Sequence, residues 1–208
     1  MADKKYKVKA GDCISSIAAQ AGHFWETIWN DPANAKLKQK RSNPNCLLAG
    51  DVVTVPSLRD KTETCATDQQ HRFLRKGVPT KLALQLLDGD APRANEEYQL
   101  HINGKLIEGM TDGDGKLEEV IPCRAKIAKL VVGEDEFELA LGHLDPITEM
   151  SGVQGRLTNL GYDCGKINGK LDNETREALL SFQKANGLNE TGEADSATVD
   201  KLEQRHGC

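Results

Sequence analysis

The residues of this chain that could carry out chemistry are scattered, and few stand at the spacings that catalysis or metal binding needs. The sequence contains no His-Glu-x-x-His, Gly-x-Ser-x-Gly, phosphate-loop or Cys-x-x-Cys pattern. His143 and Asp145 could begin a metal site, but no third ligand follows at a usable spacing. Glycan hydrolysis by paired carboxylates needs a cleft, and no segment outside the small modules predicted below is long enough to form one. We therefore expect no catalysis, no cofactor and no metal.

Two other groups of side chains offer weaker metal sites. Asp112 and Asp114 could hold calcium, but the twelve-residue loop with its closing glutamate is missing, which favours a plain turn. His206, Cys208 and Cys164 could bind zinc, as a minor alternative.

The six cysteines fall two to a segment, which is the distribution that local disulfides would give: Cys13 with Cys46, Cys65 with Cys123, and Cys164 with Cys208. Six free thiols in a reducing compartment are the alternative. In a three-helix bundle, the loop after the first helix and the end of the third lie at the same end, so we predict a bond between Cys164 and Cys208. Such a bond implies an oxidising destination.

Length and composition favour several small domains. The chain has 208 residues, of which 38% are hydrophobic. Its formal net charge of -5 is not that of a protein with a basic surface for nucleic acid. Residues 1–8 carry positive charge without an apolar stretch, so no secretory signal is expected. No run approaches the roughly twenty apolar residues of a membrane span. We expect synthesis in the cytoplasm and delivery to the periplasm or outside by a non-classical route.

Residues 1–57 read as strand, helix, helix, strand. A strand begins at Tyr6, and a helix with an apolar face runs from Ile14 to Ala21, with Asp12 as its predicted N-cap and Gly22 as its stop. Further helical pieces are predicted over 24–30 and 33–41, before a strand that ends at 55. Trp25 and Trp29 share a helix face and are expected to pack in the core, and the basic run 36–41 is expected to be a solvated helix face.

These residues resemble the LysM module, which in its family binds the N-acetylglucosamine backbone of peptidoglycan or chitin. The resemblance implies a glycan site at Gly11, Asp12, Cys13, Ile14, Asn43, Pro44, Asn45 and Leu48. The chain departs from the family at Cys13, where threonine is usual, and in its longer connection between helix and strand. That longer form resembles LysM modules of phage-tail-like contractile machines.

The middle of the chain reads as a polar linker over 58–70 and a small antiparallel β-sandwich over 71–145. Apolar residues alternate with polar ones at Tyr98, Leu100 and Ile102, and turn signals recur about every ten residues. Thr111 and the glycine-rich turn that follows it resemble prealbumin-like or carboxypeptidase-regulatory sandwiches, which serve as spacers.

Residues 146–208 return to helical periodicity and contain an internal repeat. A stretch from Gly169 to Leu179 matches one from Gly192 to Leu202 at glycine, aspartate, threonine and leucine, and in each the aspartate can cap a helix. The segment resembles the three-helix peptidoglycan-binding domain that accompanies many cell-wall hydrolases. The resemblance implies a glycan groove at Tyr162, Asn168, Gly169, Asp172 and Thr175.

Together these patterns predict a multidomain α+β protein with a LysM module, a β-sandwich spacer and a three-helix bundle. The predicted function is non-catalytic binding of peptidoglycan or an N-acetylglucosamine polymer. The combination of modules also resembles accessory proteins of type VI secretion and related contractile injection systems. Two alternatives stay open: a structural adaptor or cargo protein that binds spike or baseplate proteins, and a cell-wall hydrolase with an unrecognised site.

Overall fold

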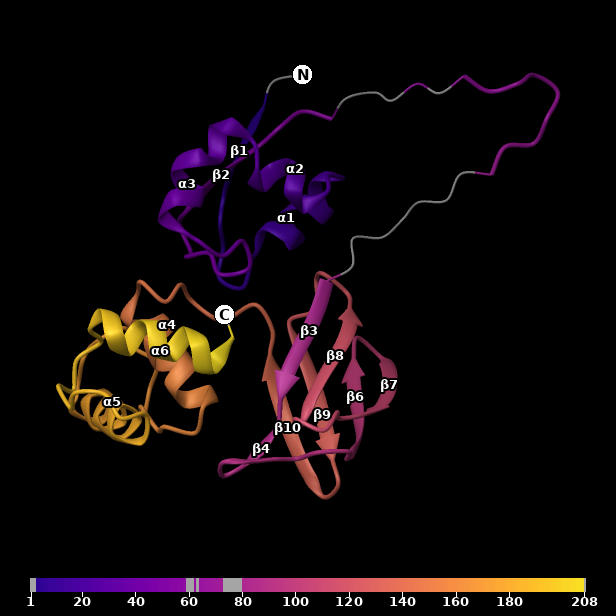
Figure 1. The fold of residues 1–208 in the computed structure, drawn as a ribbon. Helices are drawn as coiled ribbons and strands as arrows, with labels where there is room; N and C mark the ends of the chain where they lie inside the picture. The colour runs from indigo at the N-terminus through magenta and orange to yellow at the C-terminus, as the bar shows by residue number, and fades with distance from the viewer. Residues whose placement is uncertain (1–2, 59–61, 63, 73–79, 208) are drawn as a thin grey trace. The chain divides into compact units, whose positions relative to one another are not determined.

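The computed structural model describes residues 3–58, 62, 64–72 and 80–207, which form helices and antiparallel strands (Figure 1). These residues divide into two compact units. The first contains the chain up to Tyr6, Cys13–Ala35 and Val52–Leu141. The second contains Lys7–Asp12, Lys36–Asp51 and the residues from Gly142 on. The N-terminal segment therefore contributes to both units.

The N-terminal segment has the predicted order of strand, helices and strand. Its elements are β1 (Lys4–Lys7), α1 (Ile14–Ala21), α2 (Trp25–Trp29), the 3-10 helix η1 (Pro32–Asn34), α3 (Ala35–Lys40) and β2 (Val52–Val55). β1 and β2 form a two-stranded sheet. Trp29 is buried, as predicted for a core residue, whereas Trp25 is half-buried. Buried Asn34 ties η1 to β2, because its side chain exchanges hydrogen bonds with the backbone of Thr54 at 2.7 and 2.8 Å.

Cys13, and not the predicted Asp12, is the N-cap of α1. The Cys13 thiol accepts a hydrogen bond from Ser16 N at 3.4 Å, and the Ser16 hydroxyl accepts one from Cys13 N at 3.0 Å, which completes a capping box. Asp12 instead accepts from Lys9 N at 3.0 Å and closes the preceding turn. Gly22 ends the helix as predicted, with a φ of 77° that favours glycine.

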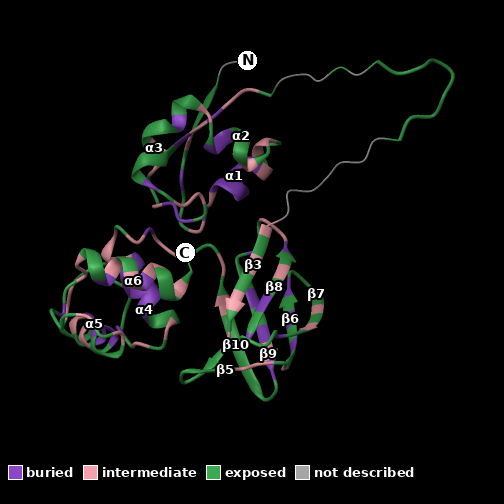
Figure 2. Ribbon diagram, in the orientation of Figure 1, coloured by how far each residue is buried: buried purple, intermediate pink, exposed green. Residues whose placement is uncertain are grey.

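The middle of the chain forms two antiparallel sheets around one core. One sheet has the order β10-β9-β6-β7, the other pairs β3 with β8, and a short ribbon pairs β4 with β5. The buried residues alternate along β6 as predicted, and Leu117 of β8 joins the same core (Figure 2). The bounds are β3 (Thr80–Gln85), β4 (Leu87–Asp88), β5 (Ala91–Pro92), β6 (Glu97–Ile102), β7 (Lys105–Met110), β8 (Lys116–Ile121), β9 (Ile127–Val132) and β10 (Asp135–Ala140).

Tyr98 fills a gap that a glycine leaves in the neighbouring strand. Gly109 pairs with Tyr98 across β6 and β7, and a Cβ atom placed at Gly109 would lie within 2.5 Å of the Tyr98 ring. The Tyr98 hydroxyl donates to Glu119 of β8 at 2.6 Å. Burial, and then the bond to Glu119, raises the pKa of Tyr98 to about 12. The tyrosine therefore links the two sheets in its neutral form.

The C-terminal segment is a three-helix bundle, as predicted. Its helices are α4 (Met150–Asn159), α5 (Asn173–Ala185) and α6 (Ser196–His206). Val153, Leu157, Leu179, Phe182 and Leu202 are almost completely buried in its core. Among the residues that the structure describes, no helix in the chain is long and apolar enough to cross a bilayer.

The predicted disulfides are not formed. None of the five cysteines within the described residues is in a disulfide, and this includes both members of the pairs Cys13 with Cys46 and Cys65 with Cys123. Cys164 points into the bundle core with no exposed surface, and its thiol donates to Tyr162 O at 3.6 Å. Burial raises the pKa of the Cys164 thiol. The side chain thus acts as a small core residue, while its predicted partner Cys208 lies outside the described residues.

Candidate functional site

Gln154 of α4 organises the loop that leads into α5. Its amide oxygen accepts hydrogen bonds from the backbone N–H groups of Asn168 and Gly169 at 3.1 and 2.9 Å. Its amide nitrogen donates to Thr175 Oγ1 at 2.8 Å and to Lys170 O at 3.1 Å. Gln154 has no exposed surface, so these bonds are shielded from water. We call Gln154 and its partners the first cradle.

Asp172 closes the first cradle as the N-cap of α5. Its carboxylate accepts from Thr175 N at 3.0 Å, from the Thr175 hydroxyl at 2.6 Å and from the Asn168 side chain at 2.8 Å. These bonds, that of the Thr175 hydroxyl first, lower the pKa of Asp172 to about 2. Asn168, Gly169, Asp172 and Thr175, four of the five predicted site residues, are thus brought together, but their polar groups are largely committed to holding the loop.

A second cradle repeats this arrangement between α5 and α6. Gln183 accepts from Gly192 N at 2.9 Å, and its amide nitrogen donates to Thr198 Oγ1 and Thr191 Oγ1, both at 2.9 Å. Asp195 caps α6 by accepting from Thr198 N at 2.9 Å. The internal repeat in the sequence therefore has a structural cause, which is two helix N-termini held in the same way.

The loop from 162 to 170, whose last residues are held by the first cradle, lies at the surface of the bundle. Ile167 is 54% exposed, a high value for a large apolar side chain, and the neighbouring Lys166 and Lys170 are exposed. Tyr162 is half-buried, with its ring edge-on to Phe182 at a centroid distance of 5.4 Å. The loop offers one apolar side chain between two cations, and the first cradle holds the backbone from Asn168 to Lys170.

One family model matches this bundle. Residues 148–202 match the family model described as "Putative peptidoglycan binding domain". The match confirms the prediction of a peptidoglycan-binding domain at the C-terminal end. No curated protein and no solved structure shows significant similarity to the chain.

The side chains that support the peptidoglycan-binding domain were only partly predicted. Gln154 and Gln183 were not among the predicted residues, although each is a polar residue beside a core position of an amphipathic helix. That placement is the signal that could have identified them, because a buried amide must find partners.

The candidate residues of the N-terminal segment have mixed surroundings. Ile14 is completely buried in the core, so its side chain is not available to a ligand. Asp12 and Cys13 are engaged in the turn and cap described above. Asn43 and Pro44 are half-exposed and Asn45 is exposed, and the Asn43 side chain accepts from Asn45 N at 2.8 Å. The part of this set that can meet a ligand therefore lies mainly in the 43–45 turn.

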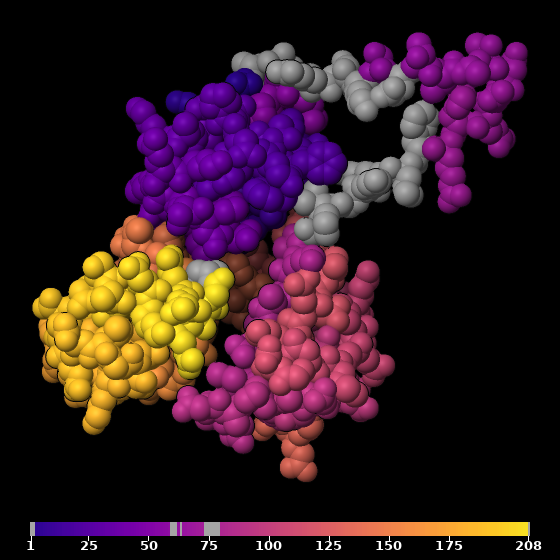
Figure 3. Space-filling view, in the orientation of Figure 1, coloured from indigo at the N-terminus to yellow at the C-terminus, as the bar shows by residue number. Residues whose placement is uncertain are grey.

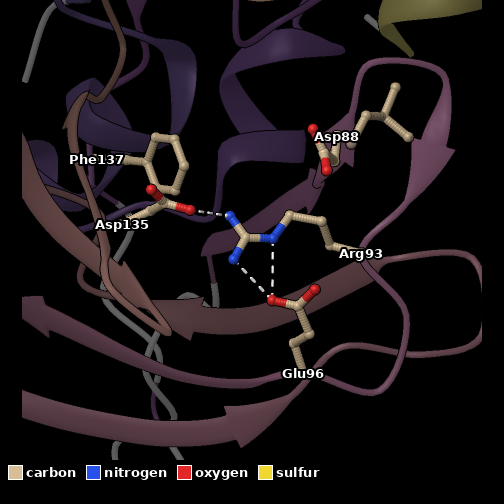
Figure 4. Close-up of a pocket in the computed structure, with 6 residues that line it drawn as sticks. Asp88, Arg93, Glu96, Asp135 and Phe137 are labelled. Carbon is tan, nitrogen blue, oxygen red and sulfur yellow. Dashed lines mark hydrogen bonds and ion pairs between the residues drawn. The ribbon is translucent and has the colours of Figure 1, made fainter.

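The antiparallel sheets in the middle of the chain carry a separate polar hollow of about 380 Å³, which is lined by Leu87, Asp88, Arg93, Glu96, Asp135 and Phe137 (Figure 4). Arg93 crosses it and donates to Glu96 at 2.7 Å and to Asp135 at 2.7 Å. The hydrogen bond to Glu96, followed by that to Asp135, raises the pKa of Arg93. Since Arg93 also donates to Val132 O, it mainly ties the turn after β5 to the β9–β10 hairpin.

Within the part of the chain that the structure describes, the weak metal sites of the sequence do not assemble. Within the described ranges, no group of three or more histidine, cysteine, aspartate or glutamate side chains could hold a metal ion. Asp112 accepts from the backbone N–H groups of Asp114 and Lys116 at 2.9 and 2.8 Å, as a plain turn does. The zinc alternative included Cys208, which lies outside the described residues.

Proposed function

We propose that this chain is a non-catalytic protein that binds peptidoglycan, with the 162–170 loop of its C-terminal domain as one contact surface. The observation that carries the proposal is the match of residues 148–202 to the peptidoglycan-binding family. In this proposal the working chain acts in the periplasm or outside the cell, where the wall lies.

The chemistry of the loop supports this assignment. Peptidoglycan offers the apolar faces of sugar rings beside the carboxylates of its peptide stems. Exposed Ile167 can pack on such a face, while Lys166 and Lys170 can pair with carboxylates. Because the first cradle fixes the backbone from Asn168 to Lys170, the loop is held in shape before the ligand arrives.

The LysM-like N-terminal segment supports a second contact with the same polymer. Each contact alone is expected to be weak, since both surfaces are shallow. Two contacts on one chain raise the effective concentration of the second, so insoluble wall should be held more firmly than a short soluble fragment.

Co-sedimentation with purified insoluble peptidoglycan tests the proposal on the full chain. We expect wild-type protein in the pellet and a loss of at least fivefold in affinity for the double variant Lys166→Ala, Lys170→Ala. Lys184→Ala, which removes an exposed lysine from α5, is the matched control and should bind normally. Wild-type protein that stays in the supernatant would contradict peptidoglycan binding. Equal binding by all variants would remove the 162–170 loop from the site.

An adaptor role in a contractile injection system is the second candidate, and the long connection in the LysM-like segment favours it. Copurification with spike or baseplate proteins, without wall binding, would support that role. Hydrolase activity is tested by zymography on purified wall, where a cleared band from the full chain would contradict a non-catalytic function.

A further inference from the structure

Among the residues that the structure describes, β7 is an edge strand that pairs only with β6. It lies at the outer margin of these strands in Figure 1, and that margin of the pink region faces solvent in Figure 3. The N–H of Thr111, directly after β7, donates to Glu96 O at 2.9 Å, which fixes the bonded positions of this antiparallel pair. Because bonded and non-bonded positions alternate, every second residue of β7 turns its backbone N–H and C=O groups away from β6. These residues are Leu106, Glu108 and Met110.

The side chains of the same three residues lie on the outer face of the four-stranded sheet, where they face exposed residues of β6. Leu106 is 50% exposed and Met110 is 57% exposed, which are high values for large apolar side chains. Glu108 is exposed between them. The edge of β7 therefore presents outward-turned backbone groups together with side chains in the order apolar, acidic, apolar.

The carboxylate of Glu108 is placed on this face by a neighbour and is not neutralised. It accepts a hydrogen bond from the Gln99 side chain of β6 at 3.0 Å. Within the described ranges, no lysine, arginine or histidine forms an ion pair with it. A carboxylate that accepts one bond can still accept others, so Glu108 can pair with a cation that comes from outside the chain.

The opposite edge of the same sheet is built differently. Leu141 N donates to Lys126 O at 2.8 Å, and the same alternation then turns the backbone groups of Glu136 and Glu138 outward from β10. Glu136 also pairs with Lys129 at 2.8 Å. Charged side chains along an edge are a common protection against an added strand. β7 lacks this protection, because apolar side chains occupy two of its three outward positions.

A second copy of this chain fits the edge of β7 poorly. In the antiparallel register that pairs all three outward residues, Leu106 lies opposite the second copy's Met110. The same register places Glu108 directly opposite the second copy's Glu108, and like charges at directly opposite positions destabilise a strand pair. A partner strand with a cation at its central position would remove this repulsion and would still offer apolar residues to Leu106 and Met110.

We propose that β7 binds an extended segment of another protein, which adds to the sheet as an antiparallel strand and carries a lysine or arginine between two apolar residues at alternate positions. The outward N–H and C=O groups of β7 supply the backbone hydrogen bonds. Leu106 and Met110 pack on the apolar residues of the segment, and Glu108 pairs with its cation. This surface lies in the middle of the chain and does not depend on peptidoglycan binding.

The test uses the full chain and the peptide acetyl-Thr-Val-Thr-Lys-Thr-Val-Thr-amide. Saturating peptide should slow amide hydrogen exchange at least fivefold at Leu106, Glu108 and Met110, as measured by NMR. It should not do so at Ile107 and Gly109, whose N–H groups already bond to β6. This alternation distinguishes strand addition from contact by side chains alone. The same peptide with an N-methylated lysine should bind at least tenfold more weakly, and this control leaves the protein unchanged.

A charge exchange tests the specificity. Glu108→Lys should raise the Kd for the lysine peptide at least tenfold, and it should bind a peptide with glutamate in place of the lysine more tightly than the wild type does. Glu138→Lys is the matched control, because it makes the same change at an exposed position of the opposite edge, and it should leave the Kd unchanged.

Three results would overturn the proposal. The first is no binding of the lysine peptide, or equal binding by the wild type and Glu108→Lys. The second is slowed exchange without alternation along β7. The third is a full chain that sediments as a dimer and becomes a monomer in Leu106→Lys, which would assign the edge to a second copy.

Discussion

Replacing Gln154 with leucine should destabilise the peptidoglycan-binding domain by about 3 kcal/mol. The substitution leaves the N–H groups of Asn168 and Gly169 without their acceptor, and it also removes the donor to Thr175 and Lys170 O. A polar group left unpaired away from water costs about 1–3 kcal/mol, and solvent at the exposed loop reduces that cost. Since domains are stable by about 5–15 kcal/mol, such a loss is large.

The second cradle supplies a graded comparison. The Gln183 oxygen accepts from one backbone N–H group, that of Gly192, where Gln154 accepts from two. Gln183→Leu should therefore cost about 1 kcal/mol less than Gln154→Leu, by the same cost per group. Gln204→Leu, at an exposed position of α6, is the control and should change stability by less than about 0.5 kcal/mol.

Urea denaturation of the full chain, followed by hydrogen exchange of peptides from α4, α5 and α6, measures these differences domain by domain. If Gln154→Leu unfolds at the same urea concentration as the wild type, the buried amide does not hold the loop. If Gln204→Leu loses as much stability as Gln154→Leu, the effect comes from leucine and not from the cradle.

Three other predictions follow from groups described above. Gly109→Ala should destabilise the sandwich by roughly 1–3 kcal/mol because its Cβ would meet the Tyr98 ring, whereas Gly113→Ala, with open space around it, should not; thermal unfolding compares them. Because the folded pKa of Tyr98 is raised, its contribution to stability is complete below pH 10 and is lost as pH rises towards 12; a Tyr98→Phe variant with the same alkaline slope of Tm would contradict this. Because the folded pKa of Asp172 is lowered, its contribution is present above pH 3.8 and is lost as pH falls towards 2; a carboxyl NMR titration with a midpoint near 3.8 would exclude it.

The C-terminal domain could be predicted well because its signals are local. Asp172 and Asp195 stand at N-caps with a threonine three residues later, and both bonds form as the repeat predicts. The strand around Leu100 could be predicted for the same reason, because every second residue of a single strand is buried and the sequence alternates accordingly.

Most of what could not be predicted depends on residues far apart in the chain. Arg41 ends a run of lysines, and its partners Asp51 and Glu149, the second of them 108 positions later, distinguish it from a solvated charge. Cys164 was predicted to bond to Cys208 from the loop after the first helix, but packing among the helices places its side chain in the core. The N-cap of α1 was misplaced by one residue because a thiol can accept the bond that an aspartate usually takes.

The two cradles also indicate where the peptidoglycan-binding domain can change without refolding. The glutamine stands 15 residues before the glycine N–H that it holds in the first cradle and nine residues before it in the second. After each glycine, the spacing to the aspartate and the threonine is the same. The cradle therefore fixes the register of the following helix while leaving the length of the preceding loop free. Insertions between Lys166 and Ile167, beyond the buried Cys164, should alter ligand preference at small cost to stability, which makes this part of the loop the natural position for diversification or engineering.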